Sequence, residues 1–282
     1  MADQNRTRTQ RGPVTRVLRF VVIAYVFVLV VWPVSVVAQR TFAPVDGQEG
    51  GFGAFVERLQ DPAVVYAFSL TGTVTFWAVL INTVFGVGIS LLLVRYRFPG
   101  RRALSVLVDL PMSVSPVVVG LALVLAYSTG SGWFGQALAA IGIHIIFSTP
   151  GLVMATAFVS LPLVIREVVP VLEEIGTEAE QAARSLGASG LQTFRRITLP
   201  SIKWAVLYGV VLSLARSLGE FGAVKIVSQG AAFNGETATL LIQNRYGNFD
   251  ESTAYAAAFV LVVAAVLAIV VVTLIRKPEG TK

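Results

Sequence analysis

Long apolar stretches separated by short polar segments dominate this chain. A helix needs about 20 apolar residues to cross a bilayer, and six stretches reach roughly that length. Because lipid offers no hydrogen-bond partner to the backbone, each stretch is expected to cross as a helix. The pattern predicts an all-α membrane protein, surrounded by membrane lipid, with six transmembrane helices at about residues 17–38, 66–94, 103–127, 149–169, 204–228 and 254–275.

The polar segments divide the chain into parts. Residues 1–16 form a basic tail, residues 39–65 a loop rich in glycine and acidic residues, and residues 276–282 a second short tail. The first apolar stretch is longer than the roughly 7–15 residues of a signal-peptide core, so we expect it to be retained as a span. Residues 66–275 then form the main transmembrane domain, which contains a long polar loop over residues 170–203.

The distribution of charge predicts the orientation. Only 13% of the residues are charged, against about 25% in soluble domains. The net charge is +6, and 17 of the 22 arginines and lysines fall in segments that six spans would put on one side. Because such an excess marks the cytoplasmic side, both termini are predicted to be cytoplasmic and residues 39–65 extracytoplasmic. The positive charge is therefore a topology signal and does not indicate nucleic-acid binding.

Residues that bind metals or cofactors are scarce. The chain has no cysteine, and its single histidine, His144, lies between two isoleucines. His144 is expected to be structural, and the sequence predicts no disulfide, no metal site and no cofactor. The P-loop pattern Gly-x4-Gly-Lys-Ser/Thr is absent. The chain is therefore not expected to be an enzyme, and if transport is driven by ATP, another polypeptide hydrolyses it.

The polar loop has a local structure of its own. Thr177 with Glu180 fits a capping box, so a helix is expected to begin there. Gly187 suits the left-handed conformation that often follows the end of a helix. Ser189 with Gln192 fits a second capping box, which would begin a second short helix. The loop is thus predicted to be a helix, a glycine corner and a helix.

The third apolar stretch contains a possible interruption. Pro111 and Pro116 stand five residues apart, and two prolines at this spacing disturb a helix. Backbone groups that a break leaves free at membrane depth are tolerated only against protein or a water-filled cavity. The stretch therefore supplies candidates for a translocation path, or alternatively it is an ordinary kinked span with Asp109 near the cytoplasmic interface. The candidates are Asp109, Pro111, Ser113, Ser115 and Pro116.

The fifth apolar stretch carries opposite charges at depth. Arg216 and Glu220 lie roughly 18 Å and 24 Å from the start of the stretch. Because they are four residues apart, their side chains can meet on one helix face. An ionised residue at such depth is a functional candidate by default, although we expect this pair to be structural. Neighbouring glycines permit close approach or a bend, so the candidates for a path or gate are Arg216, Gly219, Glu220, Phe221 and Gly222.

The polar loop also resembles a known family. Its two alanines, single glycine and final Leu-Pro follow the spacing of the EAA loop in binding-protein-dependent ABC importer permeases, although Gln181 stands where the family has glutamate and the acid is one place earlier. The resemblance implies the type I importer transmembrane fold and a loop that seats in a cleft of the ATPase subunit. The alternative is a solvated hairpin that only links two spans. The coupling residues implied are Glu180, Ala182, Ala183, Gly187, Ile197, Leu199 and Pro200.

The resemblance becomes narrower in other segments. Residues 96–101, 109–120, 142–176 and 214–224 resemble the sulfate/thiosulfate importer permeases, most closely the CysW-type subunits. This implies a permease subunit in a bacterial inner membrane that forms half of a translocation path. It also implies three partners, namely a sister sulfate permease in a heterodimer, a pair of ATPase subunits and an extracytoplasmic sulfate-binding protein.

Two other functions remain open at this stage. One is an importer of the same architecture for molybdate, tungstate or another oxyanion, because the sequence does not identify the anion. The other is an ion-coupled secondary transporter in which Glu220 takes up and releases a proton. The loop over residues 170–203 argues against the second class.

Overall fold

A computed structural model describes residues 13–44 and 50–275, and these residues form helices with no named strand. The all-α prediction is therefore confirmed. The first half contains α1 (Pro13–Val26), a π-helical turn η1 (Phe27–Val31), α2 (Trp32–Phe42), α3 (Phe52–Leu59), α4 (Pro62–Arg95), α5 (Arg101–Ser113), α6 (Pro116–Tyr127) and α7 (Gly135–Ala140). The second half contains α8 (Thr149–Glu174), α9 (Glu178–Ser185), α10 (Gly190–Thr193), a second π-helical turn η2 (Phe194–Thr198), α11 (Leu199–Leu218), α12 (Gly222–Val227), α13 (Ala238–Gly247) and α14 (Glu251–Ile275).

Within the described part of the chain, five helical segments are long and apolar enough to cross a membrane, and a sixth span exists if α5 and α6 count as one. Most of the predicted tail 1–16, the whole tail 276–282 and residues 45–49 of the predicted loop lie outside the described residues. The five spanning segments are Val14–Phe42, Pro62–Arg95, Thr149–Glu174, Gly190–Leu218 and Glu251–Val271.

Two of the predicted spans are not continuous helices. The predicted span 103–127 is the pair α5 and α6, which meet at an angle of 115°. The predicted span 204–228 ends as α11 at Leu218 and resumes as the short helix α12. Proline explains the first break, because a residue before proline is pushed out of the helical region, and Ser115 before Pro116 has ψ 135°.

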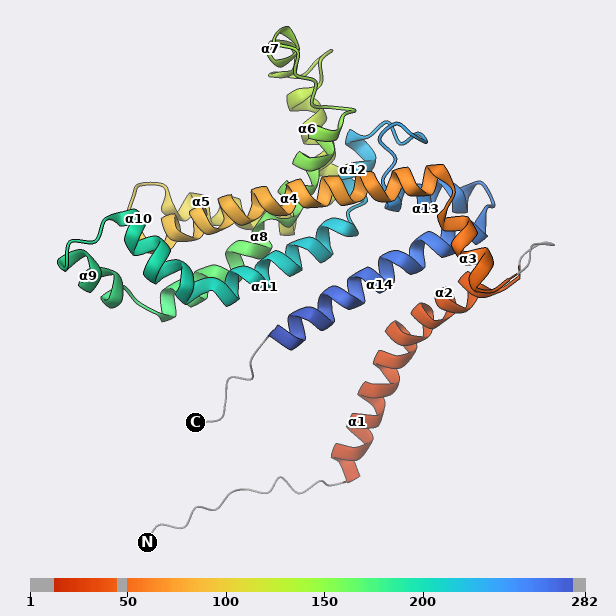
Figure 1. Ribbon diagram of the computed structural model, residues 1–282, viewed down its shortest axis with the longest axis horizontal. Helices are drawn as coiled ribbons and strands as arrows, with labels where there is room; N and C mark the ends of the chain where they lie inside the picture. The colour runs from red at the N-terminus through yellow and green to blue at the C-terminus, as the bar shows by residue number, and fades with distance from the viewer. Residues whose placement is uncertain (1–12, 45–49, 276–282) are drawn as a thin grey trace.

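The helices α4, α8 and α11 form the centre of the molecule, where they run side by side (Figure 1). Glycine allows their close approach, since a Cβ on Gly86 or Gly209 would lie 2.8 Å or 2.9 Å from atoms of Val164. An apolar cluster fills the space between them, and its fully buried members include Val164, Val168, Leu172 and Ile202.

A polar seam also joins these three helices. Asn82 on α4 donates from Nδ2 to Ser160 Oγ on α8 at 2.8 Å and to Ser213 Oγ on α11 at 3.4 Å. Ser160 Oγ also lies 3.2 Å from Ser217 Oγ on α11. Because Asn82 is 1% exposed, these bonds satisfy an amide that would otherwise be unpaired in an apolar interior.

The first span stands apart from the centre. In Figure 1, α1 diverges from the bundle, while α2 meets α3 and α14 at its far end. There Thr41 Oγ1 donates to the Tyr255 carbonyl at 3.0 Å, and the Phe42 and Phe259 rings lie 5.5 Å apart. The apolar side chains of α1 are exposed in the isolated chain, so this span has lipid or another chain as its surroundings.

Candidate functional site

The loop between α8 and α11 folds as a helix, a glycine corner and a helix. Helix α9 ends at Ser185, and Gly187 follows with φ +85°. Ser189 begins α10 with a reciprocal capping box, in which Gln192 N donates to Ser189 Oγ at 3.3 Å and Ser189 N donates to Gln192 Oε1 at 2.9 Å. The predicted corner and second capping box are therefore confirmed.

The first predicted capping box, Thr177 with Glu180, is wrong. Thr177 precedes α9, but its side chain accepts no bond from the helix backbone. Instead, Gln181 Nε2 donates to Thr177 Oγ1 at 2.8 Å. The Glu180 carboxylate is unable to reach back to Thr177 because it is directed into the protein, where it meets Arg95.

Arg95 and Glu180 form the main polar contact between the loop and the long helices. Arg95 Nε lies 3.1 Å from Glu180 Oε2, and the exposed fractions of the two side chains are 10% and 11%. Thr198 Oγ1 donates to Glu180 Oε1 at 2.9 Å. Sequence reasoning counted Arg95 only among the basic residues that indicate topology and missed its role in this contact. Its partner is 85 positions away, and no local pattern links the two.

The other predicted coupling residues lie at the surface of the same loop. Ala182, Gly187 and Pro200 are exposed, whereas Ala183, Ile197 and Leu199 are half-buried. Two leucines beside them are strongly exposed, with Leu186 at 89% and Leu191 at 75%. Exposed apolar side chains at one end of the bundle are typical of a surface that meets another protein. Figure 1 shows α9 and α10 together at this end.

The break between α5 and α6 separates the first group of path candidates. Pro111 is buried inside α5, and Pro116 begins α6. Ser113 and Ser115 are exposed at the bend. Asp109 lies further back, where its Oδ1 is 2.9 Å from Arg166 Nη2 on α8, and both side chains are about half exposed.

The break between α11 and α12 contains the second group. Arg216 Nη1 lies 2.7 Å from Glu220 Oε2, so the predicted ion pair is present, although charge and not an aligned hydrogen bond holds it. The two residues do not share a continuous helix, because α11 ends before Gly219. Glu220 is 3% exposed, and its Oε1 accepts from Ala223 N at 2.9 Å. The glutamate thus binds both the end of α11 and the start of α12.

The two breaks face each other. Helices α6 and α12 pack together, as Figure 1 shows in the upper part of the molecule. A Cβ on Gly222 would lie 3.0 Å from Pro116 Cβ, and a Cβ on Gly120 would lie 2.7 Å from Ile226 Cβ. Pro116 and Gly222, which are 106 positions apart in the numbering, therefore meet in the fold. Beside them, Lys225 Nζ lies 5.3 Å from the centre of the Phe221 ring.

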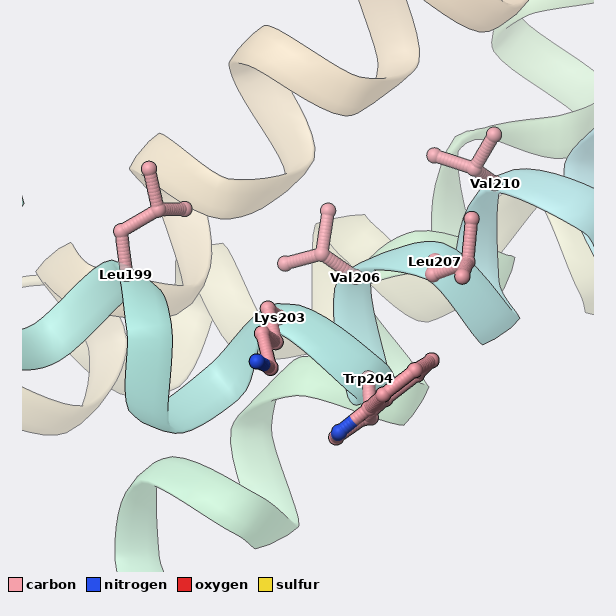
Figure 2. A pocket seen from close by; sticks show the side chains of 6 residues that line it. All are labelled: Leu199, Lys203, Trp204, Val206, Leu207 and Val210. Atoms are coloured by element: carbon pink, nitrogen blue, oxygen red, sulfur yellow. The ribbon is translucent and has the colours of Figure 1, made fainter. Parts of the chain in front are cut away.

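A shallow hollow of about 500 Å³ lies along α11 and is mostly apolar. Figure 2 shows that all its labelled residues come from this helix, with Lys203 beside Trp204. Lys203 Nζ is 5.4 Å from the centre of the Trp204 ring. Among the described residues, no three His, Cys, Asp or Glu side chains lie close enough to hold a metal ion. The hollow is lined by Leu199, Lys203, Trp204, Val206, Leu207 and Val210.

Comparison with known proteins identifies the family. Residues 82–277 match the family described as binding-protein-dependent transport system inner membrane component. The chain is 43% identical over 256 residues to the sulfate transport system permease protein CysW of Synechococcus elongatus, covering 91% of this chain and 87% of that protein. It is 41% identical over 222 residues to the sulfate transport system permease protein CysT of Salmonella typhimurium, covering 79% and 80%.

The fold is shared with a solved importer. A bacterial ABC transporter that imports the polysaccharide alginate matches with a TM-score of 0.73 at 20% identity, over 93% of each chain. This supports the predicted type I importer fold. The match to the transport family over most of the chain, and the identity to two sulfate permeases, agree with that fold. The chain therefore belongs to the binding-protein-dependent transport system inner membrane components, as a multi-pass permease subunit of the sulfate permease group and not an enzyme.

Proposed function

We propose that this chain is the membrane-spanning permease subunit of an ATP-driven importer of sulfate or thiosulfate. The observation that carries this proposal is the similarity to a permease named for sulfate transport over 91% of the chain. The loop with its Gly187 corner supports it, because a structured polar loop between two spans offers a docking surface for a separate ATPase.

The proposed partners are a sister sulfate permease, a pair of ATPase subunits and an extracytoplasmic sulfate-binding protein. The similarity to both CysW and CysT supports a heterodimer, because two different permeases of one named transport system resemble this chain at 43% and 41% identity. The family description names dependence on a binding protein. The alginate importer with a similar fold has been solved with its periplasmic protein bound.

Three surfaces remain available for such partners. The exposed side of α1 and the apolar hollow along α11 would face lipid or the sister permease. The exposed leucines of the loop, Leu186 and Leu191, would face the ATPase. In this proposal the loop and both termini are cytoplasmic, which the excess of arginine and lysine in those segments supports.

The two helix breaks are the proposed wall of the translocation path. Their irregular backbone suits a position beside a water-filled path, because free backbone groups are not tolerated against lipid. Glu220 is paired with Arg216, so the protein supplies little net positive charge at this depth. A tightly held dianion would need several donors. The permease is therefore proposed to pass the anion without binding it tightly.

The deciding experiment is uptake of labelled sulfate into vesicles that hold the whole complex. Uptake is expected to require ATP and the binding protein, and to be reduced by thiosulfate. Uptake that persists without ATP would exclude an ABC importer and favour ion-coupled transport through Glu220. Uptake blocked by trace molybdate but not by thiosulfate would keep the architecture and change the substrate to molybdate or a related oxyanion.

A further inference from the structure

Arg95, the last residue of α4, binds several parts of the molecule at once. All three nitrogens of its guanidinium are in use. Nη1 donates to the Leu172 carbonyl at 2.9 Å and Nη2 donates to the Gly176 carbonyl at 2.7 Å. Nε donates to Glu180 Oε1 at 3.2 Å. The group formed by Arg95, Glu180, Thr198 and these two carbonyls is called the Arg95 clamp below.

The clamp joins four elements of the fold. Leu172 lies in the last turn of α8, where carbonyls lack partners within the helix, so Arg95 caps that helix with a positive charge. Glu180 comes from α9, and Thr198 is the last residue of η2, directly before α11. Arg95 therefore connects the end of α4 with the end of α8 and with α9, and Glu180 extends the connection through Thr198 to the start of α11.

The two arms of the loop are attached in different ways. In α9, which is described in full, Glu180 is the one buried residue. Ala183 is half-buried, and the other side chains of α9 are exposed. In the second arm, Phe194 packs against the apolar cluster that contains Val168 and Leu172. The first arm is therefore held by an ion pair, and the second by apolar packing.

We propose that Arg95 is a positioning residue that fixes α9 to the long helices and passes movement of the loop to α4 and α8. This inference rests on the proposed function, in which the loop contacts an ATPase. An ion pair can pass on such movement because the largely buried Glu180 carboxylate has no other partner of equal strength. Arg95 and α9 are therefore expected to move together. Gln181, at the position where the family has glutamate, is exposed and takes no part in the clamp.

A first experiment measures how firmly α9 is held in the absence of the ATPase. The chain has no native cysteine, so a nitroxide can be attached at Leu186→Cys, beside the end of α9, or at Leu191→Cys, in the second arm. In the permease pair in lipid, Arg95→Gln and Glu180→Gln are expected to increase nitroxide mobility at position 186 and to leave position 191 unchanged. Unchanged mobility at 186, or an equal increase at both positions, would overturn the inference.

A second experiment measures coupling in the whole importer. The expected result is that the Arg95→Gln/Glu180→Gln variant retains its ATPase subunits while sulfate uptake per ATP hydrolysed falls about tenfold or more, as expected when hydrogen bonds to a charged group are lost. Arg95→Gln alone should be worse than the double variant, because it leaves the Glu180 carboxylate buried and unpaired. The matched control is Arg97→Gln, an exposed arginine two residues further on.

The outcomes separate the inference from the proposed function. A wild-type complex without ATP-dependent sulfate uptake would contradict the proposed function, and the nitroxide result would still test the clamp. A wild-type complex that works, with unchanged uptake per ATP in both clamp variants, would overturn the inference alone. Loss of ATPase subunits in proportion to loss of uptake would also overturn it, because Arg95 would then only maintain the fold.

Discussion

An arginine with several partners lies at each end of helix α4, and the two groups differ in burial. The Arg95 clamp is at the end of the helix, and a group centred on Arg245 is at its start. At its start, Asp61 caps the helix and its Oδ2 lies 2.9 Å from Arg245 Nη2. Arg245 Nη1 also lies 3.2 Å from Asp250 Oδ2. This group of Arg245, Asp61 and Asp250 is called the Arg245 clamp. It is about one-third exposed, whereas the side chains of Arg95 and Glu180 are about one-tenth exposed.

The partners of the two arginines also differ. Asp61 accepts from Ala63 N, and Asp250 accepts from Thr253 N, so each aspartate caps a helix without help from Arg245. Apart from Arg95, the Glu180 carboxylate accepts only from the Thr198 hydroxyl among the described residues. Removal of Arg245 should therefore leave two satisfied and partly hydrated aspartates, whereas removal of Arg95 leaves a buried charge. The stability that each arginine contributes is therefore expected to depend less on its number of ion pairs than on the hydrogen bonds that its carboxylate partners retain without it.

The largest effect is expected from the two arginines themselves. Arg95→Gln should cost about 3–5 kcal/mol as a broken buried pair, whereas Arg245→Gln should cost about 0–1 kcal/mol, because its pairs are partly hydrated. The measurement is the thermal midpoint of the purified complex in detergent, with both variants made in the same background. Equal losses of stability would contradict the distinction between the clamps.

The next effect concerns the Arg216–Glu220 pair, which joins a partly exposed arginine to a buried glutamate, with side chains 38% and 2% exposed. Glu220→Gln or Arg216→Gln alone should reduce assembly or uptake, and the double variant should recover part of the loss, with a coupling energy of about 0.5–3 kcal/mol. A double-mutant cycle on complex yield and sulfate uptake measures this. Losses that simply add would indicate that the two residues do not act as partners.

A smaller effect on stability is expected from a substitution at the loop corner, which alters the loop but not the Arg95 clamp. Gly187 has φ +85°, and a side chain there costs about 1–2 kcal/mol. Gly187→Val should reach the membrane at normal levels but lose uptake and ATPase association. Gly190→Val is the matched control, because a Cβ at Gly190 meets no atom within 4 Å and φ is not positive. Normal uptake in Gly187→Val would remove the corner from the coupling role.

The smallest effect on activity is expected from cysteines that only report which side of the membrane each clamp faces. Phe249→Cys lies next to Asp250 in the Arg245 clamp, and Leu186→Cys lies next to α9, at positions 91% and 89% exposed. An impermeant thiol reagent added to intact cells should label position 249 and not position 186. The reverse pattern would invert the predicted orientation, and the cysteine-free parent chain provides the background.

Sequence reasoning predicted the parts of the fold that depend on neighbouring residues. The first, second, fourth and sixth spans lie where apolar stretches predict them, and the Gly187 corner and the Ser189–Gln192 capping box are present. Each depends on residues within one helical turn or one continuous span. The Thr177–Glu180 box failed although its pattern is correct, because a buried arginine competes for the same carboxylate. A local pattern gives no sign of such a competitor.

The sequence alone determined that this chain crosses a membrane through helices, carries a structured polar loop and contains prolines and glycines able to break two spans. These properties follow from hydropathy, charge and local backbone preference. Only the tertiary structure decided which breaks meet, with Pro116 against Gly222, and which arginine holds the loop, with Arg95 on Glu180 across 85 positions. The physical reason is that helix packing brings together residues distant in the chain, and burial then determines how strongly each polar group depends on its partner.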